Sequence, residues 1–330
     1  MRYDVFGLEN PVMDILAQVP DSFLHEARIE KNRWVMIDEA RHRDLLKAMQ
    51  GLPLVHDTGG SCANTIVGMA HLGAKAAYCG MVGADEHGRI YARKLEEAGV
   101  TSFLRASSLP TGNAVILVTP DAGRTMNLFL GACRDLGPQD VPVDEIRQSR
   151  WLYTTGYAWD TDSQKEAVQL ALRTAKAAGV PVAFSLADPH YATQHREDFL
   201  RLIRDYTELV FANRDEALAL TGCDHVHEAL RELRKLCPAV ALTMGHAGAL
   251  ISQHGEVAYV EAFPVHPLDT TGAGDAFAAG YLYGRVTGAS PFQCGRLGSY
   301  FASRVITQIG PRLSGDVRGQ LAPVLNDVRE

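Results

Sequence analysis

Strand-like and helix-like segments alternate along most of this 330-residue chain, and this alternation limits the possible folds more than any other feature. The continuous apolar runs typical of buried strands are "WLYTTG" (151–156), "VPVAFSLAD" (180–188), "ELVFAN" (208–213) and "AVALTMG" (239–245). Helical segments lie between them at 162–179, 195–206 and 226–237. Strands that alternate with helices of this length indicate βαβ units. They predict an α/β fold, a doubly wound, mostly parallel sheet with helices on both faces and ligands at the carboxyl ends of its strands.

Two regions, residues 28–37 and 102–130, look β-rich without intervening helices. The second contains "NAVILVT", a Pro-Asp-Ala-Gly turn at 120–123 and "RTMNLFL", which together predict a hairpin. We expect the two regions to pair into one small sheet that covers the active edge of the main domain. The predicted large domain comprises residues 1–9, 41–101 and 133–330, and the predicted lid is a discontinuous β unit of residues 10–40 and 102–132.

The composition is that of an ordinary globular protein, with 46% hydrophobic and 22% charged residues. A formal net charge of −7 leaves no basic footprint for nucleic acid. The sequence lacks a run of 18 apolar residues, and its first residues lack the pattern of a signal peptide, so we expect a cytoplasmic protein that does not span a membrane. The six cysteines are expected to be reduced, and "CDHVH" (223–227) is expected to be a polar loop rather than a zinc site.

The stretch "HPLDTTGAGDAFAAGYLYG" (266–284) places three small residues between a pair of threonines and an aspartate, where a long apolar helix is expected to begin. A helix N-terminus has unpaired N–H groups and partial positive charge, and small residues let a phosphate approach the backbone. Gly272, Ala273 and Gly274 would therefore form an anion hole for a transferred phosphoryl group. Asp275 beside it would accept a proton from an attacking hydroxyl. The alternative interpretation is a tight capping turn before an ordinary N-terminal aspartate.

Other phosphate-binding motifs are missing from the sequence. It contains no GxxxxGKS/T, HRD or DFG pattern, which argues against a P-loop NTPase and a protein kinase. A dinucleotide-binding GxGxxG would need a glycine where Phe277 stands, so an NAD-dependent dehydrogenase is disfavoured.

Four motifs, in order along the chain, resemble those of the ribokinase-like (PfkB) family of carbohydrate and nucleoside kinases. They are "TGGSCANTIVGMAHLG" (58–73), "NRDEA" (213–217), "TMGHAGAL" (243–250) and "DTTGAGDAFAAGYLYG" (269–284). Within the family the chain is most similar to bacterial adenosine kinases, through "FGLENPVMDIL" (6–16), "DAGRTMNLFLGA" (121–132) and "ITQIGPRL" (306–313). Glu9 departs from that pattern, which has glycine at this position.

The resemblance implies an acceptor site and a catalytic group. Asp14 would accept hydrogen bonds from ribose hydroxyls, because a carboxylate offers two acceptors to two vicinal donors. Asn10 and Asn64 would also belong to this site, and Gly59 and Gly60 would let the backbone approach the sugar. Asp275 would be the general base for the 5′-hydroxyl, and Arg124 would reach the migrating phosphate from the lid.

The resemblance also implies binding positions for ATP and for metal ions. The ATP site would include Asn213, Thr243, Gly245 and Gly248, with Glu216 holding Mg²⁺ through water. Asn213 and Glu216 also fit a helix-capping box, and both interpretations can hold together. Further positions, Asp269 and Thr271 with Gly310 as carbonyl donor, match a site for a monovalent cation such as K⁺ in many family members.

The function that this resemblance implies is an ATP-dependent kinase of a ribonucleoside, with adenosine converted to AMP in purine salvage. Apolar residues of the expected lid, Trp34, Met36 and Phe129, could stack on the base, or could simply pack the lid. The alternatives are a kinase of ribose, fructose or a similar sugar, and a non-catalytic nucleotide or sugar sensor, which Asp275 argues against. We expect a monomer or a homodimer that binds small molecules.

Overall fold

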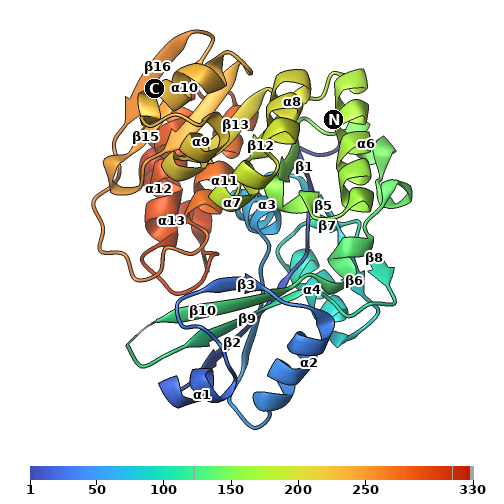
Figure 1. The fold of residues 1–330 in the computed structure, drawn as a ribbon. Helices are drawn as coiled ribbons and strands as arrows, with labels where there is room; N and C mark the ends of the chain where they lie inside the picture. Colours follow the sequence, from blue (N-terminus) through green and yellow to red (C-terminus); the bar gives the residue numbers. More distant parts are fainter. Residues whose placement is uncertain (122, 314, 328–330) are drawn as a thin grey trace.

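A nine-stranded sheet forms the centre of the molecule, which the computed structural model describes at residues 1–121, 123–313 and 315–327 (Figure 1). The strand order is β16-β15-β14-β13-β12-β11-β1-β5-β7. Neighbours from β7 to β14 run parallel, and only the β14–β15 and β15–β16 pairs are antiparallel. The bounds are Val5–Leu8 (β1), Ala76–Cys79 (β5), Thr101–Ser102 (β7), Leu152–Thr155 (β11), Val182–Ser185 (β12), Leu209–Asn213 (β13), Ala239–Thr243 (β14), Ala249–Gln253 (β15) and Glu256–Val260 (β16). The expected doubly wound, mostly parallel sheet is confirmed.

Helices cover both faces of this sheet because its central strands are apolar on both sides. One face packs against Val143–Arg147 (α5), Asp162–Ala178 (α6), Pro189–Gln194 (α7), Arg196–Tyr206 (α8), Arg214–Thr221 (α9) and Val226–Arg234 (α10). The other face packs against Ser61–His71 (α3), Glu86–Glu97 (α4), Ala273–Thr287 (α11), Pro291–Val305 (α12) and Val317–Asp327 (α13). The sequence marks some helix ends directly: α6 ends at Gly179, whose φ of 68° lies in the left-handed region that glycine adopts at little cost.

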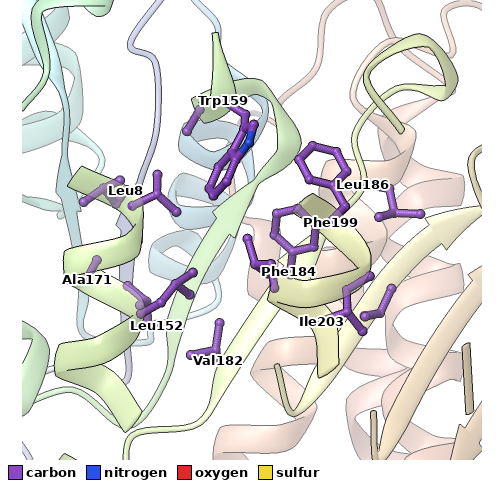
Figure 2. Close-up of a cluster of buried hydrophobic side chains, with 14 of the residues drawn as sticks. Leu8, Leu152, Trp159, Ala171, Val182, Phe184, Leu186, Phe199 and Ile203 are labelled. Carbon is purple, nitrogen blue, oxygen red and sulfur yellow. The ribbon is translucent and has the colours of Figure 1, made fainter. Parts of the chain in front are cut away.

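Figure 2 shows how the first of these faces is packed. Leu152 of β11 and Phe184 of β12 point from the sheet toward α6 and α8, where they meet Ala171 and Phe199. The ring centroids of Phe184 and Phe199 are 5.2 Å apart, and the two ring planes meet at 75°, an edge-on arrangement that aromatic pairs favour. This packing holds the strands in place, and with them the loops that follow their carboxyl ends.

A second sheet of five strands, in the order β3-β10-β9-β2-β4, lies beside the edge of the large domain (Figure 1). Its strands are Met13–Gln18 (β2), Trp34–Met36 (β3), Val55–Thr58 (β4), Asn113–Val118 (β9) and Arg124–Phe129 (β10). The expected hairpin is present as the antiparallel β9–β10 pair, although Ala122 in its turn lies outside the described residues. Because β3 pairs with β10 and β2 pairs with β9, the two β-rich regions do form one sheet.

The boundary expected after residue 40 differs from the observed sheet. Strand β4, assigned to the large domain from the sequence, pairs with β2 in the small sheet. The helix Glu39–Ala48 (α2) also packs there, because its Leu45 contacts the apolar underside of the sheet, as does Leu24 of Asp21–Glu26 (α1). The sequence of α2 did not indicate which sheet its apolar face would cover.

The topology brings several loops to one place. Strand β1 leads into the small sheet, and the chain returns to β5 on one side of β1 and later to β11 on the other. A crevice forms at such a switch point, outside the carboxyl ends of the two strands. Here Asn10, after β1, donates a hydrogen bond of 2.8 Å to the carbonyl of Tyr157, after β11. In the described part of the chain, no helix has the length and hydropathy needed to cross a membrane.

Candidate active site

Two cavities meet at the N-terminus of α11. A cleft of about 360 Å³ lies between the large domain and the small sheet, and a second cavity of about 640 Å³ lies between η4 (Gly245–Ala247) and α12. Both are lined by Thr270, Ala273 and Gly274, and the first is also lined by Asp275. Molecules bound in the two cavities can therefore approach each other at this turn.

The turn itself requires glycine at one position and leaves space at another. Gly272 is the N-cap of α11 with φ of 74°, and a Cβ there would lie 2.5 Å from Cβ of Pro311. Gly274 is helical, and a Cβ there would meet no atom within 4 Å, so the space above it is open. The N–H group of Ala273 donates to the carbonyl of Thr270 at 3.2 Å, so the free donors of the turn begin after it.

Asp275 is held from two sides within this turn. Its Oδ1 accepts a hydrogen bond of 2.6 Å from Ser61 Oγ, and its Oδ2 accepts one of 2.9 Å from Asn64 Nδ2. Burial raises the pKa of Asp275 to about 6, against the lowering effect of these two donors and of Arg312. Asp275 is thus mostly ionised at pH 7, and its pKa is close enough to that pH for the carboxyl group to exchange a proton.

The cleft contains the residues that the resemblance predicts around a sugar. Asp14 of β2 faces the cleft beside Gly59, where a Cβ would lie 2.6 Å from Asp14 Oδ1. Gly60, with φ of 93°, passes so close to Asn10 that a Cβ would lie 2.6 Å from its carbonyl. Asn10 itself is fixed by the protein, since its Oδ1 accepts from Gln164 Nε2 at 2.7 Å and its Nδ2 donates to the Tyr157 carbonyl.

Four carboxyl groups line this cleft, those of Glu9, Asp14, Glu216 and Asp275, and burial is the main influence on the pKa of each. It raises the pKa of Glu9 to about 8, of Asp14 to about 7 and of Glu216 to about 7. Glu9, the departure from the family pattern, accepts a 2.8 Å hydrogen bond from the Cys62 N–H group at the start of α3. Glu9 therefore caps the helix that follows the double glycine, where Gly60 offers no side chain for the purpose.

An apolar wall lies beyond Asp14 on the small sheet. Trp34, Ile116, Met126 and Leu128 line the cleft there, with Trp34 directly opposite Met126 in the strand pairing. Phe129 does not belong to this wall. It points to the other face of β10, where its ring stacks on His42 of α2 at 4.4 Å, because successive strand residues face opposite sides.

On the nucleotide side, Asn213 and Glu216 form the expected capping box of α9. Asn213 Oδ1 accepts from the Glu216 N–H, and both Glu216 oxygens accept from Asn213, at 2.9 Å from its backbone N–H and 2.6 Å from Nδ2. The pair lines the first cavity, close to Gly274. Thr243, Gly245 and Gly248 line the second cavity, and Gly248 allows a close approach to the carbonyl of Val260.

The proposed residues for a monovalent cation do not form an open site in this arrangement. Asp269 Oδ1 accepts from Thr271 Oγ1 at 2.6 Å, and its Oδ2 accepts from the N–H group of Gly310 at 3.0 Å. Arg124 of β10 adds an ion pair of 2.7 Å to the same Oδ2. Gly310 thus contacts Asp269 through its N–H group, and the monovalent-cation site stays a prediction.

The residues of the site that the sequence analysis missed include Ser61, Arg312 and Met126. Ser61, which follows the double glycine, donates a hydrogen bond to Asp275. Arg312 donates from Nε to Asn64 Oδ1 at 2.8 Å, and it comes from "ITQIGPRL", which carried a resemblance but no assigned role. Met126 faces the opposite side of β10 from Phe129, because the two residues are separated by an odd number of positions along the strand.

The two glycines of the turn are expected to respond differently to alanine. Gly272→Ala should destabilise the protein by about 1–2 kcal/mol from the left-handed backbone alone, and more from the contact with Pro311. Gly274→Ala should leave stability equal or up to about 1 kcal/mol higher, because the site is helical and open. Urea unfolding of both variants tests this. Equal destabilisation by the two changes would contradict the described turn.

Comparison with known proteins agrees with this geometry. The model of the pfkB family of carbohydrate kinases matches residues 35–317. The structure of a probable sugar kinase from Rhizobium etli superposes with a TM-score of 0.90 at 39% identity, covering 98% of this chain and 99% of that one. An adenosine kinase from Sinorhizobium meliloti gives a TM-score of 0.89 at 38% identity, with the same coverage. An uncharacterized sugar kinase from Archaeoglobus fulgidus is 30% identical over 252 residues, which is 74% of this chain and 97% of the relative. The chain therefore belongs to the pfkB family of carbohydrate kinases, and it is a phosphotransferase that acts on a hydroxyl group.

Proposed function

We propose that this kinase transfers the γ-phosphoryl group of ATP to the 5′-hydroxyl of a ribonucleoside, with adenosine the preferred acceptor and AMP the product. The observation that carries the proposal is the meeting of the two cavities at Gly274 and Asp275. The larger cavity would hold the nucleotide and the cleft would hold the nucleoside. Such a kinase would serve purine salvage.

Asp275 is the proposed general base. It takes the proton of the 5′-hydroxyl while the hydroxyl oxygen forms a bond to the γ-phosphorus and the bond from that phosphorus to the ADP oxygen breaks. The free N–H groups at the start of α11 face the negative charge of the transferred group. Arg124 lies on the lid side of the cleft, and it would contact that group after leaving Asp269.

Mg²⁺ would neutralise charge on the ATP phosphates when bound. Glu216 would contact the ion through water, with its carboxyl group held by the hydrogen bonds from Asn213. The pair would orient metal-bound waters from the edge of the cavity. Thr243, Gly245 and Gly248 would bound the rest of the nucleotide.

Asp14 is the proposed ribose-binding residue, with Gly59 and Gly60 allowing the sugar to approach the backbone. Asn64 has one Nδ2 hydrogen left for a hydroxyl, because its other groups contact Asp275 and Arg312. Asn10 supports the site by fixing the switch point rather than by offering free hydrogen-bonding groups.

The apolar wall of the cleft supports a nucleoside over a free sugar. Trp34, Met126 and Leu128 would pack against a planar base, which gains from leaving water. A free sugar would either leave this wall exposed or place hydroxyls against it without partners. The likeness to the Sinorhizobium meliloti adenosine kinase points the same way.

A sugar kinase is the second candidate. It is favoured by the names of two similar proteins, the probable sugar kinase of Rhizobium etli and the sugar kinase of Archaeoglobus fulgidus. The carboxylate of Asp14 would serve vicinal hydroxyls of a sugar equally well.

An acceptor panel separates the two candidates. We expect the highest kcat/KM for adenosine among adenosine, inosine, 2′-deoxyadenosine, ribose and fructose, assayed for ADP release with MgATP. The deoxy analogue should lose about ten- to a hundredfold, because it leaves a hydrogen-bond acceptor of the closed site unpaired. Trp34→Ala should lower kcat/KM for adenosine more than for ribose, whereas Val35→Ala, on the opposite side of the exposed strand β3, should affect neither. A preference for ribose or fructose over every nucleoside would rule out the adenosine assignment.

Asp275→Asn should lower kcat by roughly 10²-fold or more, which is the scale of lost general-base catalysis. The fold should persist, because the amide keeps the size of the side chain and its oxygen can still accept from Ser61 or Asn64. ATP binding measured by calorimetry should be unchanged. Asp162→Asn, on a fully exposed carboxylate at the start of α6, is the matched control. Near-normal turnover of the Asp275 variant would remove this residue from the mechanism.

We also propose that the small sheet is a lid that closes over the acceptor and excludes water from the reaction. In this structure Arg124 of β10 already reaches across to Asp269 of the large domain. Hydrogen exchange in β2, β3, β9 and β10 should slow when acceptor saturates the enzyme, while α6 serves as an unchanged reference. Equal exchange in these strands with and without acceptor would argue against closure.

A further inference from the structure

Arg312 joins Asn64, which donates a hydrogen bond to Asp275, to Thr58 at the end of the small sheet. Arg312 lies after α12, and its Nε donates to Asn64 Oδ1 at 2.8 Å while its Nη1 donates to Thr58 Oγ1. Its third nitrogen, Nη2, is buried, and Arg312 also interacts with the side chain of Tyr91, whose hydroxyl donates to the carbonyl of Gly59 at 2.7 Å.

The bond from Arg312 decides which way the Asn64 amide points. The oxygen and nitrogen of an asparagine amide have nearly the same shape, so their partners select the orientation. Arg312 can only donate, so it binds the amide oxygen and leaves Nδ2 to face Asp275 Oδ2 at 2.9 Å. The reversed amide would place its oxygen against the carboxylate of Asp275. Asp275 would then lose one of its two hydrogen-bond donors and keep only Ser61.

The second arm of Arg312 fixes the link between the two sheets. Thr58 is the last residue of β4 and directly precedes Gly59 and Gly60, which lead into α3. Both Thr58 and Asn64 are buried, so the guanidinium joins the two ends of this short connection. A movement of the small sheet about the double glycine would therefore shift the Asn64 amide, and with it the hydrogen bond that the amide donates to Asp275.

Charge gives Arg312 a further effect on the same carboxylate. The groups that face Asp275 are Ser61, Asn64, Cys62, Glu9, Tyr153, Tyr157, Glu216 and Arg312. Of these, Arg312 is the only permanent cation, and it lowers the pKa of Asp275 and that of Asp14 against the burial that raises both. The other charged groups are acids, which favour the protonated carboxyl.

From these contacts we infer that Arg312 is a positioning residue of the phosphoryl transfer: it sets the Asn64 amide that aims Asp275 and couples that amide to the end of β4. The inference rests on the proposed role of Asp275 as the base. It does not depend on which acceptor is used. Lysine should not replace Arg312, because an ammonium on a flexible stem does not span Asn64 and Thr58 with the fixed fork of a guanidinium.

The test compares Arg312→Ala and Arg312→Lys with Arg318→Ala. The last variant removes another arginine of the C-terminal segment, one that donates to the carbonyl of Leu72 at the end of α3 and lies outside the site. Turnover is measured with whichever acceptor of the panel reacts fastest, so a wrong adenosine assignment leaves the comparison intact. We expect kcat to fall about 10- to 100-fold in both Arg312 variants, the scale of a misplaced catalytic group, with the KM for ATP unchanged.

Two further readouts separate positioning from packing. In the wild type, kcat should fall as the pH drops through about 6, because protonated Asp275 cannot accept the hydroxyl proton. Without Arg312 the fall of kcat at low pH should begin at a higher pH. The reason is that a nearby cation and an aligned donor no longer favour the ionised form of Asp275. Added guanidinium should partly restore kcat in Arg312→Ala. An unchanged kcat in the Arg312 variants would overturn the inference. So would a lower kcat that is accompanied neither by a shift of the pH profile nor by rescue with added guanidinium. A normal Arg312 dependence together with an active Asp275→Asn would instead overturn the proposed base.

Discussion

The burial of Asp275 is the constraint on which the site depends. Away from water its carboxyl group favours the neutral form, yet the role of general base proposed for it requires the ionised form. Ser61 and Asn64 offset part of this cost by donating to the two oxygens, and Arg312 adds a nearby positive charge. These partners come from α3 and from the segment after α12, so the ionisation of one side chain depends on how distant parts of the chain pack together.

The turn before Asp275 has glycine at two positions for different reasons. Gly272 turns the chain in the left-handed region and lies against Pro311, so the fold requires it. A Cβ on Gly274 would meet no atom within 4 Å, so glycine there leaves the space beside the helix N-terminus open. Two glycines that look equivalent in the sequence are required for different physical reasons.

Much of the architecture could be predicted from periodicity, and less of the site. Buried strands between helices predicted the parallel sheet because apolar runs of that length have few other uses. The motif residues Asp14, Asn64 and Asp275 were expected together, and they line one cleft. For Phe129 the sequence left two alternatives, stacking on a base or packing the lid. The side chain packs against His42 on the face of β10 away from the cleft, because its position along the strand decides its direction. The contacts of Arg312 and of Arg124 were not predictable, because long side chains of distant segments meet only after the sheets are placed.

The position of Arg312 along the chain has a consequence for synthesis. Domains form as the chain leaves the ribosome, N-terminal parts first. Asp14 and Asn64 emerge early, and the α11 turn emerges much later. Arg312 follows that turn in the sequence, so its guanidinium emerges after both. A nascent chain can thus contain every strand of its central sheet before the side chain that binds the Asn64 amide is available.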